Sequence, residues 1–118
     1  MSSEKRAYER KPLRLELNYR NAEGGNFLFE YSSNISHGGI FIETRHPLPQ
    51  GATLVVRFSP PNGGDEIEVE GTVTWVNPWT EGTDTPNPGM GIRWDRLEDD
   101  QRAVIANIVK AIAILPDA

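Results

Sequence analysis

Apolar and polar residues alternate along much of this chain, which is the period-2 pattern of β-strands with one buried face. The longest run covers residues 66–75, where the residues predicted to share the buried face are Ile67, Val69, Val73 and Trp75. Similar alternation predicts strands at residues 13–20, 26–34, 53–59 and 89–94. A turn at residues 21–26 joins the first two of these strands, so they are predicted to form an antiparallel hairpin.

The stretch from Ser33 to Thr44 interrupts this alternation with short polar side chains and two adjacent glycines. Its candidate ligand-binding residues are Asn34, Ser36, Gly38 and Gly39. Asn and Ser side chains bond to nearby backbone and Gly permits positive φ, so we predict a tight turn whose polar groups point inward. The turn leads directly into a predicted buried strand at residues 40–42. Because polar groups are brought against the core, this stretch is predicted to hold a small polar ligand.

Helical periodicity is confined to residues 97–115, near the C-terminus. The apolar stripe consists of Leu97, Val104, Ile105, Ile108, Val109, Ile112 and Leu115. Asp99 and Asp100 suit the first turn, because acidic side chains stabilise the positive end of the helix dipole. We predict that the stripe packs on the body of the protein, with contact to a partner as the alternative. Six short strands and one helix give a mainly β fold, either a barrel or a sandwich.

Length and charge indicate one domain with a distinct N-terminal arm. A chain of 118 residues with a net charge of −5 has room for a single core. Residues 1–20 hold six Lys and Arg against three Glu, whereas the rest of the chain holds six against fourteen Asp and Glu. We therefore divide the chain into a flexible basic arm, residues 1–11, and a folded domain, residues 12–118. This arm on an acidic body favours a small anionic ligand over DNA or RNA, although a solvated tail gives the same pattern.

The sequence lacks the usual equipment of an enzyme. It has no cysteine, so disulfides and thiol nucleophiles are excluded. His37 and His46 stand in turn-like sequence without metal-ligand spacing, and Ser36 lacks the Gly-x-Ser-x-Gly context of a nucleophile. We predict no catalytic activity, no metal and no cofactor. No apolar run is long enough to span a membrane and no secretion signal is recognisable, so we predict a cytoplasmic location.

Two separated motifs resemble those of a known family. R-A-Y-E-R at Arg6 to Arg10 and N-I-S-H-G-G at Asn34 to Gly39 are similar to the Arg-x-x-x-Arg and Asp/Asn-x-Ser-x-x-Gly motifs of PilZ domains, which are bacterial receptors for cyclic di-GMP. Their order and separation, the six-strand pattern and the terminal helix resemble the family over essentially the whole chain. The resemblance implies a six-stranded antiparallel β-barrel with a C-terminal α-helix at about residues 97–115.

The resemblance also implies a ligand-binding set, which is Lys5, Arg6, Arg10, Asn34, Ser36, Gly38 and Gly39. The two arginines of the arm would clamp cyclic di-GMP through guanine edges and phosphates, which a guanidinium fork can address in a bidentate manner. Asn34, Ser36 and Gly39 would lie beneath a guanine, with Gly39 leaving room for the base. Lys5, a basic residue directly before the motif, implies capture of two ligands per chain.

These observations together predict a single-domain receptor that changes its surface on binding cyclic di-GMP. The arm would fold over Asn34 to Gly39, and the new surface would signal to a protein of motility, type IV pili, polysaccharide synthesis or regulation. Two alternatives stay open: a PilZ-fold adaptor that binds no nucleotide, and a small barrel that stacks single-stranded nucleic acid on Phe27, Phe29 and Tyr31. Candidate partner surfaces are the outer face of the C-terminal helix and Trp79, which lies in the Pro-rich loop of residues 77–88, although Trp79 could instead fold back over the barrel end.

Overall fold

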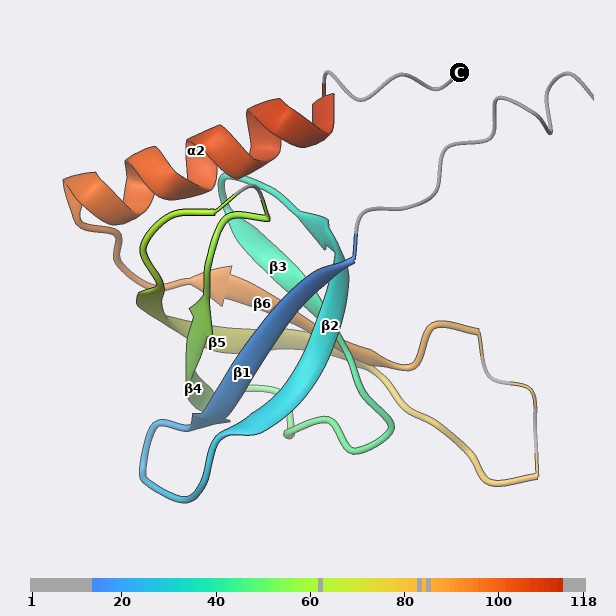
Figure 1. The fold of residues 1–118 in the computed structure, drawn as a ribbon. Helices are drawn as coiled ribbons and strands as arrows, with labels where there is room; N and C mark the ends of the chain where they lie inside the picture. The colour runs from blue at the N-terminus through green and yellow to red at the C-terminus, as the bar shows by residue number, and fades with distance from the viewer. Residues whose placement is uncertain (1–13, 62, 83, 85, 114–118) are drawn as a thin grey trace, which may run out of the picture.

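The six predicted strands are present and close into an antiparallel barrel (Figure 1). The computed structural model describes residues 14–61, 63–82, 84 and 86–113. The strands are β1 (Leu15–Asn21), β2 (Leu28–Ile35), β3 (Gly39–Glu43), β4 (Thr53–Phe58), β5 (Ile67–Asn77) and β6 (Gly89–Trp94), in the circular order β1-β2-β3-β6-β5-β4. The predicted barrel with a C-terminal helix is thus confirmed. The predicted arm, with Lys5, Arg6 and Arg10, lies outside the described residues.

The barrel interior is filled by the apolar residues that alternate along the strands. In β1, Leu15, Leu17 and Tyr19 are buried, whereas the residues between them reach the surface. The other strands contribute Ile35, Ile40, Ile42, Leu54, Val56, Phe58, Val69, Val73, Met90, Ile92 and Trp94 to the same cluster. Complete burial of a side chain of this size contributes about 1.5–3 kcal/mol, so the alternation decides which face of a strand turns inward.

Strand β5 departs from the predicted alternation at a β-bulge. Val73 lies opposite Ile92, but Trp75 lies opposite Gly91, so Thr74 is an extra residue on β5. An extra residue reverses the faces of the residues that follow it. Trp75 is therefore 51% exposed on the outside of the barrel, and the prediction that it shares the buried face of Val69 and Val73 is wrong.

The predicted turn beginning at Ser33 is shorter than expected. Strand β2 continues to Ile35, and only residues 36–38 form the turn before β3. The side chains of Asn34 and Ser36 are exposed while Ile35 fills the inward position, so the prediction of inward polar groups is wrong. Positive φ is also absent at both turn glycines. Gly39 is required for a different reason, because a Cβ there would overlap the carbonyl oxygen of Ile92 on the paired strand β6.

The C-terminal helix α2 (Asp99–Ala113) lies along the end of the barrel at which β2 turns into β3 (Figure 1). Ile105 and Ile108 are each 1% exposed and belong to the core cluster, and Leu97, Val104 and Val109 pack against it, so the apolar stripe packs on the barrel as far as Val109; its last residue, Leu115, lies outside the described residues. The helix begins after Leu97 because Glu98 caps it: the Glu98 carbonyl accepts the Arg102 N–H, and the Glu98 N–H donates to the Gln101 side chain. No helix in the described part of the chain is long and apolar enough to cross a membrane.

Candidate functional site

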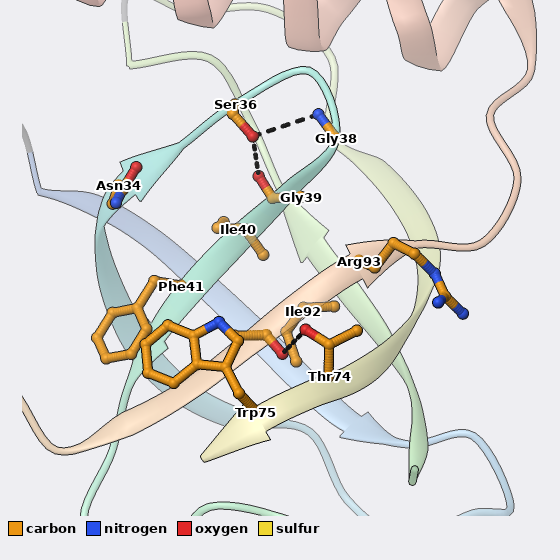
Figure 2. A pocket seen from close by; sticks show the side chains of 11 residues that line it. Asn34, Ser36, Gly38, Gly39, Ile40, Phe41, Thr74, Trp75, Ile92 and Arg93 are labelled. Carbon is orange, nitrogen blue, oxygen red and sulfur yellow. Dashed lines mark hydrogen bonds between the residues drawn. The ribbon is translucent and has the colours of Figure 1, made fainter. Parts of the chain in front are cut away.

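The polar residues singled out in the sequence line a hollow of about 300 Å³ on the outside of the barrel, here called the Trp75 hollow (Figure 2). Of the seven predicted ligand-binding residues, the four that the structure describes all line it: Asn34, Ser36, Gly38 and Gly39. The remaining lining residues come from strands β3, β5 and β6 and include Phe41, Thr74, Trp75, Gly91 and Arg93. The hollow therefore joins the predicted turn to strands that are distant in sequence.

The centre of the hollow is one row of residues that lie directly opposite one another on four strands. Asn34 of β2 pairs with Phe41 of β3, Phe41 pairs with Gly91 of β6, and Gly91 pairs with Trp75 of β5. Directly opposed residues project from the same face of a sheet, which here is the outer face. The two bulges, one in β2 and one in β5, bring Asn34 and Trp75 into this row.

Within the row, Gly91 allows the two aromatic rings to meet. A Cβ on Gly91 would overlap the Trp75 indole, which stacks on the Phe41 ring with centroids 5.3 Å apart and planes 19° apart. Figure 2 shows the two rings side by side, while Thr74 donates a hydrogen bond of 3.3 Å to the Gly91 carbonyl. The indole is thus held in place by packing and remains half exposed, which suits stacking of a planar ligand.

Asn34 is held outward by the buried hydroxyl of Ser32. This hydroxyl accepts the Asn34 N–H and donates to the Asn34 carbonyl, both at 3.1 Å. Ser32 is 1% exposed, so these two bonds fix the β2 bulge from inside the barrel. The Asn34 side chain itself forms no hydrogen bond to any other described residue, which leaves its amide available to a ligand.

The turn beside Asn34 is fixed by its own hydrogen bonds and by Trp94. The Ser36 hydroxyl accepts the Gly38 N–H at 3.2 Å and donates to the Gly39 carbonyl at 3.4 Å. The Trp94 backbone N–H donates to the Gly38 carbonyl, and the Trp94 indole N–H donates to the Ser36 carbonyl. Ser36 therefore shapes the rim of the hollow as well as offering a polar group to it.

Arg93 is the one charged residue among those that line the hollow. Its side chain is 63% exposed and forms an ion pair with Asp95 at 3.6 Å, and Asp95 also accepts the Thr72 hydroxyl at 2.7 Å. In Figure 2 the guanidinium points away from Asn34 and Trp75. The hollow is therefore lined by no carboxylate, but the charge of its one arginine is compensated by Asp95, so the described residues supply little positive charge for an anionic ligand.

Sequence reasoning missed Phe41, Thr74, Trp75 and Arg93 as site residues. Phe41 and Trp75 were predicted to lie on buried faces of strands, and Arg93 belongs to neither of the two recognised motifs. The only available signal was Gly91, since a glycine inside a strand marks a bulge or a close approach. His37 and His46 are both exposed, and Trp79 is half-buried with the Arg45 guanidinium 4.7 Å from its ring centroid.

Comparison with solved structures identifies barrels of the same fold. One is the "PilZ domain of CeSA from cellulose synthesizing bacterium", with a TM-score of 0.62 at 15% identity over 87% of this chain and 96% of that chain. Another is the Bacillus subtilis inhibitor of motility MotI/DgrA, with a TM-score of 0.64 at 19% identity over 86% of this chain. This chain spans only 48% of MotI/DgrA.

Comparison at the level of sequence assigns the family. Curated protein sequences gave no match to the chain. The sequence pattern of the PilZ domain, in contrast, matches residues 4–111, which include both motifs and all six strands. Because this match extends over nearly the whole chain, the protein belongs to the PilZ domain family.

Proposed function

We propose that this protein is a receptor for cyclic di-GMP that acts by binding rather than by catalysis. The observation that carries the proposal is the row across β2, β3, β6 and β5. It sets the half-exposed indole of Trp75 on one surface with the Asn34 amide, which bonds to no other described residue. A guanine base offers a flat face for the indole and a hydrogen-bonding edge for the amide. Stacking of this kind contributes about 1–3 kcal/mol per base.

The chain between the arm motif and β1 is short enough to keep the motif near this row. Leu15 pairs with Ser32, which is two residues from Asn34. Arg10 precedes Leu15 by five residues, and an extended chain covers about 3.3 Å per residue, so Arg10 can lie no further than roughly 17 Å from Leu15. Arg6 and Arg10 would then supply the positive charge that two ligand phosphates need. Closure of the arm over the ligand would form a new surface for a downstream protein.

The output of the receptor is proposed from its relatives. MotI/DgrA is an inhibitor of motility, and the CeSA domain comes from a cellulose-synthesizing bacterium. We place this protein in the cytoplasm as an adaptor for motility, pilus, polysaccharide or regulatory proteins, without DNA or RNA as a partner. Hydrogen exchange tests the adaptor mechanism: amides from Arg6 to Lys11 should become protected on adding ligand. Complete protection before ligand is added would mean that the arm is not the switch.

Isothermal titration with cyclic di-GMP tests the binding itself. We expect saturable binding near the micromolar range, about −8 kcal/mol, with far weaker binding of linear di-GMP and GTP. Arg6→Ala and Arg10→Ala should each weaken binding by roughly 1–3 kcal/mol with little change in melting temperature. An endpoint of two ligands per chain would support the role of Lys5. Absence of binding at tens of micromolar protein would instead favour an adaptor that binds no nucleotide.

A further inference from the structure

The first half of strand β2 has a strand neighbour on one side only. The β1–β2 pairing runs from Ser32 to Leu28, whereas the β2–β3 pairing ends at Tyr31, opposite Glu43. Residues Leu28, Phe29 and Glu30 therefore have no strand partner on the β3 side within the described part of the chain. We call this side of Leu28–Glu30 the β2 edge.

Strand β3 leaves β2 at Thr44. The Thr44 N–H donates to the Pro88 carbonyl at 3.1 Å, so the chain stays beside β6 and separates from β2. Behind the separation lie Tyr19 and Thr44, both almost completely buried, and the Thr44 hydroxyl is near enough to the Tyr19 phenol to lower its pKa, against the larger opposite effect of burial. The opening beside the β2 edge is thus closed at its base by a polar contact and does not lead into the core.

Large apolar side chains of the β2 edge are more exposed than those of strands that are paired on both sides. Leu28 lies opposite Tyr19, on the interior side of the wall, yet it is 54% exposed because no β3 residue covers it. Phe29, on the outer side, is 52% exposed. Only three large apolar side chains in the described residues are this exposed, and the third is Trp75 of the candidate nucleotide site. The edge is short and carries one inward-facing charge, Glu30, which are devices that protect natural edges from aggregation, so we expect pairing only with a segment that matches its length and its charge.

A hollow of about 560 Å³ adjoins the edge at Glu30 and extends to Arg14 and to residues 43–46 and 87–88, so two arginines and two glutamates line it. Glu43 in this hollow is paired with Arg14 at 3.3 Å, and Arg45 is stacked on Trp79. Glu30 is half-buried on the interior side, opposite Leu17, and forms no ion pair with any described residue. A carboxylate in this position favours a cationic partner, as does the net charge of −5.

We propose that the β2 edge binds an extended segment of a partner protein as an additional strand. The backbone of the segment would pair with Leu28–Glu30, an apolar residue would cover Leu28, and a Lys or Arg two positions along would meet Glu30. A three-residue edge presents few backbone groups, which suits a single extended chain, and a second copy of a chain of net charge −5 would bring like charge to Glu30. This surface would act whether or not the Trp75 hollow binds a nucleotide.

The first test uses a capped probe peptide, acetyl-Val-Thr-Lys-Thr-Val-amide, whose pattern is the same in both chain directions. We expect saturable NMR shifts confined to the amides of the β2 edge and of residues 43–46. The same peptide with N-methyl groups on all five residues has no residue N–H to donate to the edge and should lose these shifts. Equal binding of the two peptides, shifts centred on the Trp75 hollow, or no shifts up to the solubility of the probe would overturn the proposal.

The second test is a charge exchange between protein and probe. Glu30→Lys should weaken binding of the Lys peptide by about fivefold, the size expected for a partly exposed charge pair, and a Glu-containing peptide should restore it. Glu16→Lys, on the outer face of neighbouring β1, adds the same charge away from the edge and should change neither affinity. Equal effects of the two variants would contradict a Glu30 contact. Concentration-dependent self-association with protection of Leu28–Glu30 would assign the edge to a second copy of the chain instead.

Discussion

The two halves of strand β2 differ in what lies beside them, and this difference separates the two candidate binding surfaces. Tyr31, Asn34 and Ile35 pair with β3, Tyr31 and Ser32 also pair with β1, and Asn34 lies at the end of a row that continues to Trp75. Among the described residues, Leu28–Glu30 are paired with β1 alone, and the apolar side chains of Leu28 and Phe29 reach solvent. A paired half presents fixed side chains to a small ligand, whereas an unpaired half presents backbone groups to another chain.

The largest expected effect comes from disturbing the strand contact beside the paired half. Gly39→Ala places a Cβ against the Ile92 carbonyl of β6, and relieving this overlap requires the two strands to move apart. We expect a loss of about 3 kcal/mol in the free energy of unfolding, at the upper end for overpacking. Chemical denaturation measures this loss.

Gly38→Ala is the matched control for this substitution. Its Cβ would meet no atom within 4 Å, and its φ is not positive, so its stability should change by less than about 0.5 kcal/mol. If the two variants are equally stable, the close contact between β3 and β6 is not the reason that position 39 is a glycine. A defect limited to ligand binding would then indicate that Gly39 is needed only beneath the base.

Removal of the exposed indole tests the row across the barrel. Trp75→Ala should weaken cyclic di-GMP binding by about 1–3 kcal/mol, because a stacking surface is lost, and should lower the unfolding free energy by about 1 kcal/mol, because the stack on Phe41 is lost. Trp79→Ala is the matched control, since Trp79 lies outside the Trp75 hollow and contacts Arg45. Titration of both variants gives the comparison. Equal losses in the two variants would place the ligand elsewhere.

A smaller effect is expected at the junction of the two halves, where Ser32 fixes the bulge. Ser32→Ala removes both hydrogen bonds to the Asn34 backbone and should cost about 1 kcal/mol of unfolding free energy. Ligand affinity should fall as well, because Asn34 is no longer held in the row. Unfolding and titration experiments on the same variant measure the two losses. Normal affinity in a destabilised variant would show that the bulge serves only the fold.

The regular parts of this barrel and the motif residues of the site could be predicted from sequence, but the bulged strand positions that complete the site could not. In β1 every second residue is buried, because directly paired neighbours on both sides keep the alternation in phase. The motif residues Asn34 and Ser36 were found from their residue types alone. The sequence alternates without interruption through Val69, Val73 and Trp75 and therefore gives no sign of the bulge at Thr74. The exposure of Trp75 follows only from how β5 pairs with β6. The β2 edge could not be predicted from the sequence either, because it depends on the residue at which β3 separates from β2.

The smallest effect concerns the polar contact that closes the barrel behind the unpaired half. Burial raises the pKa of Tyr19 above its ordinary value of 10.0, because the charged phenolate is disfavoured inside the barrel. The neutral hydroxyl therefore stabilises the fold fully below pH 10, and this contribution is lost as pH rises through the pKa of the folded state. Unfolding free energy should fall more steeply above pH 10 in the parent than in Tyr19→Phe, which has no hydroxyl to ionise. Parallel pH profiles of the two proteins would mean that Tyr19 ionises freely in the folded state and that the gap between β2 and β3 admits water to its hydroxyl.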